Sequence, residues 1–146
     1  MSRVIGITGG IASGKSNVCK VISSLGYSVI DSDKINAEFS KKNGPIYNVI
    51  IKEFGDGYIL DDGELNKKKL GKLIFNNKEA KLKLNEITHP IIVEEIKRQI
   101  NEVNDELIFV EIPLLYEAKL EYLCDKIICV FLNKREQVIR VITELQ

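Results

Sequence analysis

A glycine-rich stretch near the start of the chain limits the possible folds more than any other feature. Residues 6–18 read GITGGIASGKSNV, and Gly9-x4-Gly14-Lys15-Ser16 matches the loop that wraps a phosphate group in backbone N–H groups. Glycines permit the close approach and the φ values of such a loop, and the helix that follows directs its positive end at the anion. Lys15 can follow the β- and γ-phosphates, while the Ser16 hydroxyl can ligate Mg²⁺. The alternative is a glycine-rich turn that only connects a strand to a helix.

Composition excludes several classes of protein. The 146 residues suit one domain, and 21 basic residues balance 21 acidic ones, so there is no general attraction to nucleic acid or to an anionic membrane. The three cysteines lack CxxC spacing and there is one histidine, which argues against a zinc site and against a disulfide framework. No apolar run approaches the roughly 20 residues of a membrane helix. We therefore expect a cytoplasmic protein without nucleic-acid or membrane partners.

Short apolar runs separated by helical patterns predict an α/β fold. Four runs are typical of parallel strands that are buried on both faces, at residues 4–8, 27–31, 107–112 and 126–132. After the first run, helical spacing puts four apolar residues on one face, namely Val18, Val21, Ile22 and Leu25. This alternation predicts a P-loop NTPase fold, with a parallel sheet flanked by helices.

The rest of the chain is predicted to be mostly helical. We expect a single P-loop domain whose core comprises residues 1–33 and 105–146 and whose helical, substrate-binding insertion comprises residues 34–104. Pro90 is predicted to open a helix, because proline is favoured at the first helical position. A last helix is predicted from about residue 134 to the end.

Acidic residues follow two of the predicted strands. Asp31 and Asp33 come at the end of the second strand, at the carboxyl edge of the sheet where the phosphates are expected. Either carboxylate could accept a proton from a substrate hydroxyl, and either could instead cap the next helix. Glu111 ends the third strand, where P-loop proteins carry a metal-binding acid, usually Asp.

Two features of the insertion have both a binding and a structural interpretation. The basic run NKKKLGK at residues 66–72 could hold a substrate phosphate, although such runs are more often solvated helix faces. His89 and Pro90 could contact substrate, or the histidine could cap a helix that Pro90 opens.

Five segments in order resemble dephospho-coenzyme A kinases over essentially the whole chain. They are GITGGIASGKSNV, GYSVIDSDKI, FGDGYILDDGELNKKKLGKLIF, LNEITHPII and VEIPLLYE. The resemblance implies transfer of the γ-phosphoryl group of ATP, with Mg²⁺, to the ribose 3′-hydroxyl of dephospho-CoA, the last step of coenzyme A synthesis.

The resemblance also implies roles for individual residues. The catalytic residues would be Asp33 as base, Lys15 and Arg140, and the metal ligands would be Ser16 and Glu111. Nucleotide contacts are implied for Gly10, Ile11, Ala12, Ser13, Gly14, Lys15, Ser16 and Asn17. Substrate contacts are implied for Thr8, Asp31, Lys67, His89, Pro90 and Leu114.

The chain departs from the family pattern in a few places. Asn17, Lys67 and Glu111 stand where Thr, Arg and Asp are common, and Lys67 lacks the bidentate fork of arginine. Family members continue for some 50 residues with an arginine-bearing lid, a last strand and adenine contacts, so the chain is expected to be C-terminally truncated. Residues 126–132 would then form an exposed apolar edge that favours dimerisation or poor solubility.

Three other functions fit parts of the sequence. NKRE at residues 133–136 is close to the NKxD guanine motif of GTPases, although position 136 is Glu. Another small-molecule P-loop kinase, for a nucleotide or shikimate, would keep the same phosphate loop. An ATP-binding fragment without turnover would keep the loop and lack the lid.

Overall fold

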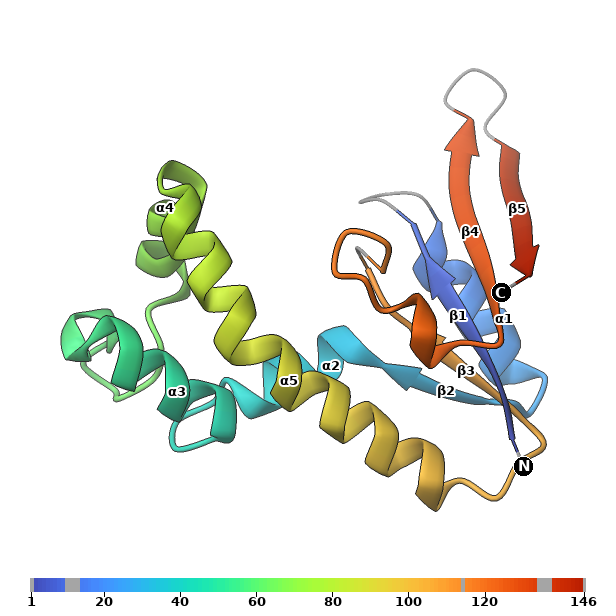
Figure 1. Ribbon diagram of the computed structural model, residues 1–146, viewed down its shortest axis with the longest axis horizontal. Helices are drawn as coiled ribbons and strands as arrows, with labels where there is room; N and C mark the ends of the chain where they lie inside the picture. The colour runs from blue at the N-terminus through green and yellow to red at the C-terminus, as the bar shows by residue number, and fades with distance from the viewer. Residues whose placement is uncertain (1, 10–13, 114, 134–137, 146) are drawn as a thin grey trace. The chain divides into compact units, whose positions relative to one another are not determined.

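The computed structural model describes residues 2–9, 14–113, 115–133 and 138–145, with backbone only from residue 131 onward. The chain divides into two compact units (Figure 1). The first unit comprises Met1–Asp33 and Ile96–Gln146, and the second comprises Lys34–Glu95. Two helices, α2 (Ser32–Phe39) and α5 (Lys78–Glu102), run from one unit into the other.

The first unit is built on a five-stranded sheet with the order β2-β3-β1-β4-β5. Its strands are β1 (Arg3–Thr8), β2 (Ser28–Asp31), β3 (Leu107–Glu111), β4 (Lys126–Asn133) and β5 (Val138–Leu145). The first four are parallel, and β5 is antiparallel to β4. The predicted α/β fold with a parallel sheet is therefore confirmed, and the four predicted strands correspond to β1–β4.

Helix α1 (Lys15–Ser24) covers one face of this sheet (Figure 1). Cys19 is buried in a core cluster with side chains of β1, β3 and β4, and Val18 and Ile22 pack against that cluster. The prediction that Val21 and Leu25 share the buried face is wrong, because these side chains are 59% and 69% exposed. The helix buries the stripe formed by residues 18, 19 and 22, which is narrower than the predicted one.

Strand register places the ends of β1, β2 and β3 at the same level of the sheet. Ile7 pairs with Glu111 on one side of β3, and Asp31 pairs with Glu111 on the other. The loop after β1 and the start of α2 therefore both begin beside Glu111. This edge is where side chains from three different segments of the sequence meet.

The C-terminal segment is a strand and not the predicted helix. The β5 backbone pairs with β4 along its full length, from Asn133 with Val138 to Lys126 with Leu145. Its valines and isoleucines suit a strand, and pairing satisfies the backbone groups of β4 that would otherwise be exposed. The predicted free edge at residues 126–132 is therefore also wrong.

The second unit is helical. It contains α3 (Pro45–Phe54), a 3₁₀ turn (Asp56–Tyr58), α4 (Lys67–Asn76) and most of α5. Its core cluster consists of Ile46, Tyr47, Ile50, Leu65 and Leu70. The prediction that a helix begins at Pro90 is wrong, because Pro90 lies inside α5. This proline is exposed, so the carbonyl that loses its N–H partner can bond water instead. Among the described residues, no helix combines the length and the apolar character that crossing a bilayer requires.

Candidate active site

The phosphate-loop region begins at the buried end of β1 and ends at the start of α1. Thr8 is the last residue of β1 and is 6% exposed. Gly14 is the N-cap of α1 with φ of 93°, a left-handed conformation that favours glycine. The carbonyl of Gly14 accepts hydrogen bonds from the N–H groups of Asn17 and Val18 and so begins the helix. Ser16 and Asn17 are exposed in the first turn.

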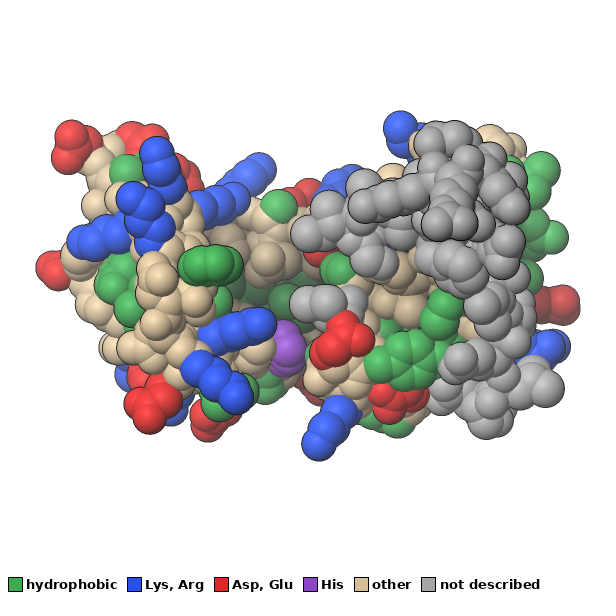
Figure 2. All heavy atoms as spheres, turned by 90° about the horizontal axis from the view of Figure 1, so that it is seen from above, with side chains coloured by type: hydrophobic (Ala, Val, Ile, Leu, Met, Phe, Trp, Pro, Cys, Tyr) green, Lys and Arg blue, Asp and Glu red, His purple; other side chains and the backbone are tan. Residues whose placement is uncertain are grey.

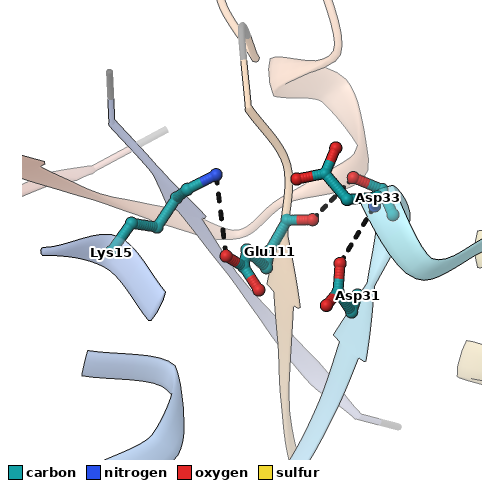
Figure 3. A network of polar contacts seen from close by, with 5 residues as sticks. Lys15, Asp31, Asp33 and Glu111 are labelled. Carbon is teal, nitrogen blue, oxygen red and sulfur yellow. Dashed lines mark hydrogen bonds and ion pairs between the residues drawn. The ribbon is translucent and has the colours of Figure 1, made fainter. Parts of the chain in front are cut away.

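Lys15 and Glu111 form an ion pair at the carboxyl edge of the sheet (Figure 3). Lys15 Nζ lies 3.6 Å from Glu111 Oε1, and the two side chains are 11% and 8% exposed. A buried carboxylate needs a partner because desolvation disfavours an isolated charge. The lysine that follows the glycine-rich loop and the acid that ends the third strand therefore lie together at this edge.

The Cys19 thiol lies one helical turn after Lys15 and interacts with the same carboxylate. Burial, the charge of Glu111 and a hydrogen bond to Glu111 raise the pKa of Cys19 to about 12, against a smaller lowering effect of Lys15. The thiol is therefore neutral at physiological pH and acts as a donor to the carboxylate. Sequence reasoning missed this contact, although the i, i+4 spacing from Lys15 puts both residues on one side of the helix.

The two aspartates after β2 have different environments. Asp31 Oδ1 accepts a hydrogen bond of 2.9 Å from the N–H of Asp33, so Asp31 caps α2. Asp33 is exposed in the first turn of that helix. Figure 3 shows its carboxylate at the end of β3, on the side where Lys15 lies. Of the two carboxylates, that of Asp33 is the better placed to meet a substrate.

Ser32, between the two aspartates, was not singled out from the sequence. Its hydroxyl donates a 2.7 Å hydrogen bond to the backbone carbonyl of Glu111. Ser32 is 6% exposed, as is Glu111. The position of this small polar residue, directly after a buried strand, is the sequence feature that indicates a hydrogen bond to a neighbouring strand.

Three other predicted substrate residues, Lys67, His89 and Pro90, belong to the second unit. Lys67 is the exposed first residue of α4, and His89 is half-buried within α5, where burial lowers its pKa. In the second unit, a shallow depression is lined by Asn66, Lys68, Lys69 and Lys72, and basic side chains gather over this unit in Figure 2. Lys69 donates to the Gly57 carbonyl at 2.7 Å. One lysine of the basic run is therefore engaged in a structural contact, while Lys67 and Lys68 are exposed at the start of α4.

Several predicted site residues lie outside what the structure describes. These are Gly10, Ile11, Ala12, Ser13, Leu114 and most of the NKRE segment. Arg140 lies in β5, of which only the backbone is described.

Comparison with known proteins identifies the family. The sequence model of the dephospho-CoA kinases matches residues 3–145. The chain belongs to the dephospho-CoA kinase family. It is 41% identical over 141 residues to a dephospho-CoA kinase of Carboxydothermus hydrogenoformans, covering 94% of this chain and 68% of that one. It is 38% identical over 146 residues to a dephospho-CoA kinase of Halalkalibacterium halodurans, covering 98% and 73%.

Solved structures agree with this assignment. The fold matches TT1252 from Thermus thermophilus with a TM-score of 0.80 and 29% identity, over 93% of this chain and 69% of that one. It matches the dephospho-CoA kinase from Campylobacter jejuni with a TM-score of 0.69 and 33% identity, over 92% and 68%. The family supports the kinase interpretation of the glycine-rich loop, and not the GTPase, nucleotide kinase or shikimate kinase alternatives.

Proposed function

We propose that this chain transfers the γ-phosphoryl group of ATP to the ribose 3′-hydroxyl of dephospho-CoA, with Lys15 and Asp33 as its central residues. The observation that carries the proposal is the meeting of Lys15 with Glu111 beside the start of α2, within a chain of the dephospho-CoA kinase family. Membership of that family makes the chain a kinase.

ATP is proposed to bind with its phosphates at the N-terminus of α1. The helix directs its free N–H groups and its dipole at this position, and Gly14 adopts the φ value that a phosphate loop needs. The proposed contacts are Gly10, Ile11, Ala12, Ser13, Gly14, Lys15, Ser16 and Asn17. Lys15 would then turn from Glu111 toward the β- and γ-phosphates, since phosphate offers more negative charge than one carboxylate.

The residues at this edge suit a Mg²⁺ ion. Mg²⁺ prefers oxygen ligands, and it is usually held by one or two protein groups together with phosphates and water. The Ser16 hydroxyl and the Glu111 carboxylate are two such donors. When bound, the ion would neutralise charge on the transferring phosphoryl group.

Asp33 is proposed to accept the proton of the ribose hydroxyl. Its carboxylate is exposed, whereas one oxygen of Asp31 is occupied by the cap of α2. As a base, Asp33 would orient the hydroxyl and take its proton as the bond to phosphorus forms. Lys15, together with Arg140, would stabilise the negative charge of the phosphoryl group in the transition state.

Six residues are proposed to contact the rest of dephospho-CoA. Thr8, Asp31 and Leu114 belong to the first unit, and Lys67, His89 and Pro90 belong to the second. Because burial lowers the pKa of His89, its imidazole is neutral near pH 7 and can both donate and accept a hydrogen bond. Lys67 supplies a positive charge for a phosphate of the substrate.

A coupled assay for ADP tests the proposal. Dephospho-CoA, nucleoside monophosphates and shikimate are offered separately with ATP and Mg²⁺, and turnover is expected with dephospho-CoA alone. Asp33→Asn should lower kcat about 10²- to 10⁴-fold and leave the Kd for ATP nearly unchanged. Asp61→Asn, which alters an exposed aspartate of the second unit, is the matched control and should leave kcat unchanged. Turnover with shikimate or a nucleoside monophosphate but not dephospho-CoA would refute the substrate assignment, and normal turnover of Asp33→Asn would refute the role of the base.

A further inference from the structure

We propose that Ser32 is a positioning residue that holds the Asp33 carboxylate in place for phosphoryl transfer. The inference rests on the proposed function, because it concerns the same base. It starts from the 2.7 Å hydrogen bond in which the Ser32 hydroxyl donates to the Glu111 carbonyl. Both residues are 6% exposed, so water competes little for this bond.

The bond extends the pairing of two strands into the start of a helix. Asp31 and Glu111 are the last paired residues of β2 and β3, and α2 begins at Ser32. From Ser32 onward the backbone follows the helix and leaves the β-ladder. The serine side chain therefore supplies the next link between the two segments, at the position where backbone pairing stops.

Asp33 is held from both sides by this arrangement. Its own N–H donates to Asp31 Oδ1 at 2.9 Å, and its neighbour Ser32 is tied to Glu111 (Figure 3). The first contact orients the turn relative to β2, and the second fixes its distance from β3. With both in place, the first turn of α2 has little freedom to rotate or slide.

Glu111 also contacts residues of the phosphate-binding helix α1. Its carbonyl accepts from Ser32, while its carboxylate lies 3.6 Å from Lys15 Nζ and accepts a hydrogen bond from Cys19. One residue therefore ties the helix that carries the base to the helix that carries the lysine. Loss of the Ser32 bond would let Asp33 move relative to the phosphoryl group, and phosphoryl transfer depends steeply on such positions.

The kinetic test is a double-mutant cycle on Ser32 and Asp33, assayed with ATP and dephospho-CoA. Ser32→Ala is expected to lower kcat about fivefold to twentyfold, with the KM for ATP changed less than about twofold, since the phosphate loop is intact. In an Asp33→Asn background the same substitution should change kcat less than about twofold, because the group that Ser32 positions is already absent.

Ser40→Ala is the matched control. Ser40 is also 6% exposed, and its hydroxyl makes a 3.5 Å contact with Asn36 Oδ1 within the second unit. It should leave kcat unchanged. If Ser32→Ala lowers kcat by the same factor with and without Asp33, the serine supports the fold only and the proposal is overturned.

Hydrogen exchange gives a second measure that needs no turnover. The amides of Asp33 and Lys34 should lose protection in Ser32→Ala and keep it in Ser40→Ala. Unchanged protection in Ser32→Ala would overturn the proposal even if the variant were poorly active. Failure of the proposed function looks different: the wild type would not phosphorylate dephospho-CoA, or Asp33→Asn would be fully active, while the exchange result for Ser32 would stand.

Discussion

The ion pair between Lys15 and Glu111 makes the most direct prediction about stability. Lys15→Met removes the ammonium and keeps most of the apolar stem, so Glu111 is left as a carboxylate that is 8% exposed without its cation. Glu111→Gln removes the negative charge and keeps the shape of the side chain. The two substitutions and their combination form a double-mutant cycle that isolates the pair from the other contacts of each residue.

The separation of the charges sets the size of the effect. At 3.6 Å and an effective dielectric constant of about 20, the attraction is about 4–5 kcal/mol. Part of this offsets the desolvation of both groups, so the free energy of unfolding should fall by about 2–4 kcal/mol in Lys15→Met. For a chain of this length that corresponds to a fall in Tm of about 5–12 °C. In the Glu111→Gln background the same change should cost about 2 kcal/mol less, because no charge is left unpaired.

Urea unfolding of the four proteins, without nucleotide, measures the coupling. The exposed pair of Arg98 and Glu102, with side chains 54% and 65% exposed, is the matched control, and its cycle should give at most about 0.5 kcal/mol. A coupling between Lys15 and Glu111 no larger than that of the control would refute the argument. It would mean that solvent screens the pair at the edge of the sheet as fully as on the surface.

Two further predictions concern the packing of the first unit. Gly6→Ala should lower the free energy of unfolding by about 1–3 kcal/mol, because a Cβ at this position would lie 2.6 Å from Cys124 Sγ. Adding Cys124→Ala should restore part of the lost stability, measured by urea unfolding. If Gly6→Ala alone is as stable as the wild type, the close packing of Gly6 against Cys124 is wrong. The pKa of Cys19 is raised to about 12 from 9.0, so the folded protein disfavours the thiolate. The neutral thiol therefore contributes fully to the free energy of unfolding below pH 9, and this contribution is lost as the pH rises toward 12. The Tm of the wild type should therefore fall more steeply between pH 9 and 10.5 than the Tm of Cys19→Ala. If the two plots of Tm against pH run parallel, the thiol of Cys19 does not contribute to the pH dependence of stability.

The parallel part of the fold could be predicted because its signals are local. Each of β1 to β4 is a short apolar run, and the glycine pattern fixes where the first strand ends and the first helix begins. The C-terminal segment could not be predicted in the same way. The spacing of Val138, Val141, Ile142 and Leu145 fits a helix face, while the run of β-branched residues fits a strand. Pairing with the edge of β4 favours the strand over the helix, and the local sequence pattern carries no information about that edge.

The helix starting at Pro90 was mispredicted for a related reason. Proline favours the first turn of a helix, but it is tolerated inside one where the freed carbonyl can reach water. Pro90 is exposed, and α5 continues through it from Lys78 to Glu102. The local preference of one residue was outweighed by the helical propensity and packing of the residues on both sides.

The sequence predicts the main residues of the candidate site but not the contacts between them. The sequence indicates Lys15, Asp33 and Glu111 because each lies at the end of a recognisable strand or loop. It does not indicate Cys19 or Ser32, since their partner Glu111 lies about 80 or more residues away and becomes a neighbour only through the order of the sheet. Long-range register therefore decides which small polar side chains support the site.

The side-chain length of Glu111 gives this register a chemical consequence. Its Cα is fixed between those of Ile7 and Asp31, so only the side chain determines how far the carboxylate extends toward α1. An aspartate would be shorter by one carbon–carbon bond of about 1.5 Å, which would lengthen the 3.6 Å separation from Lys15 Nζ beyond ion-pair distance. With glutamate the acid can hold Lys15 when no nucleotide is bound, whereas with aspartate it would lie closer to the sheet. The residue at this strand end thus sets how strongly the phosphate-binding lysine is held before ATP arrives.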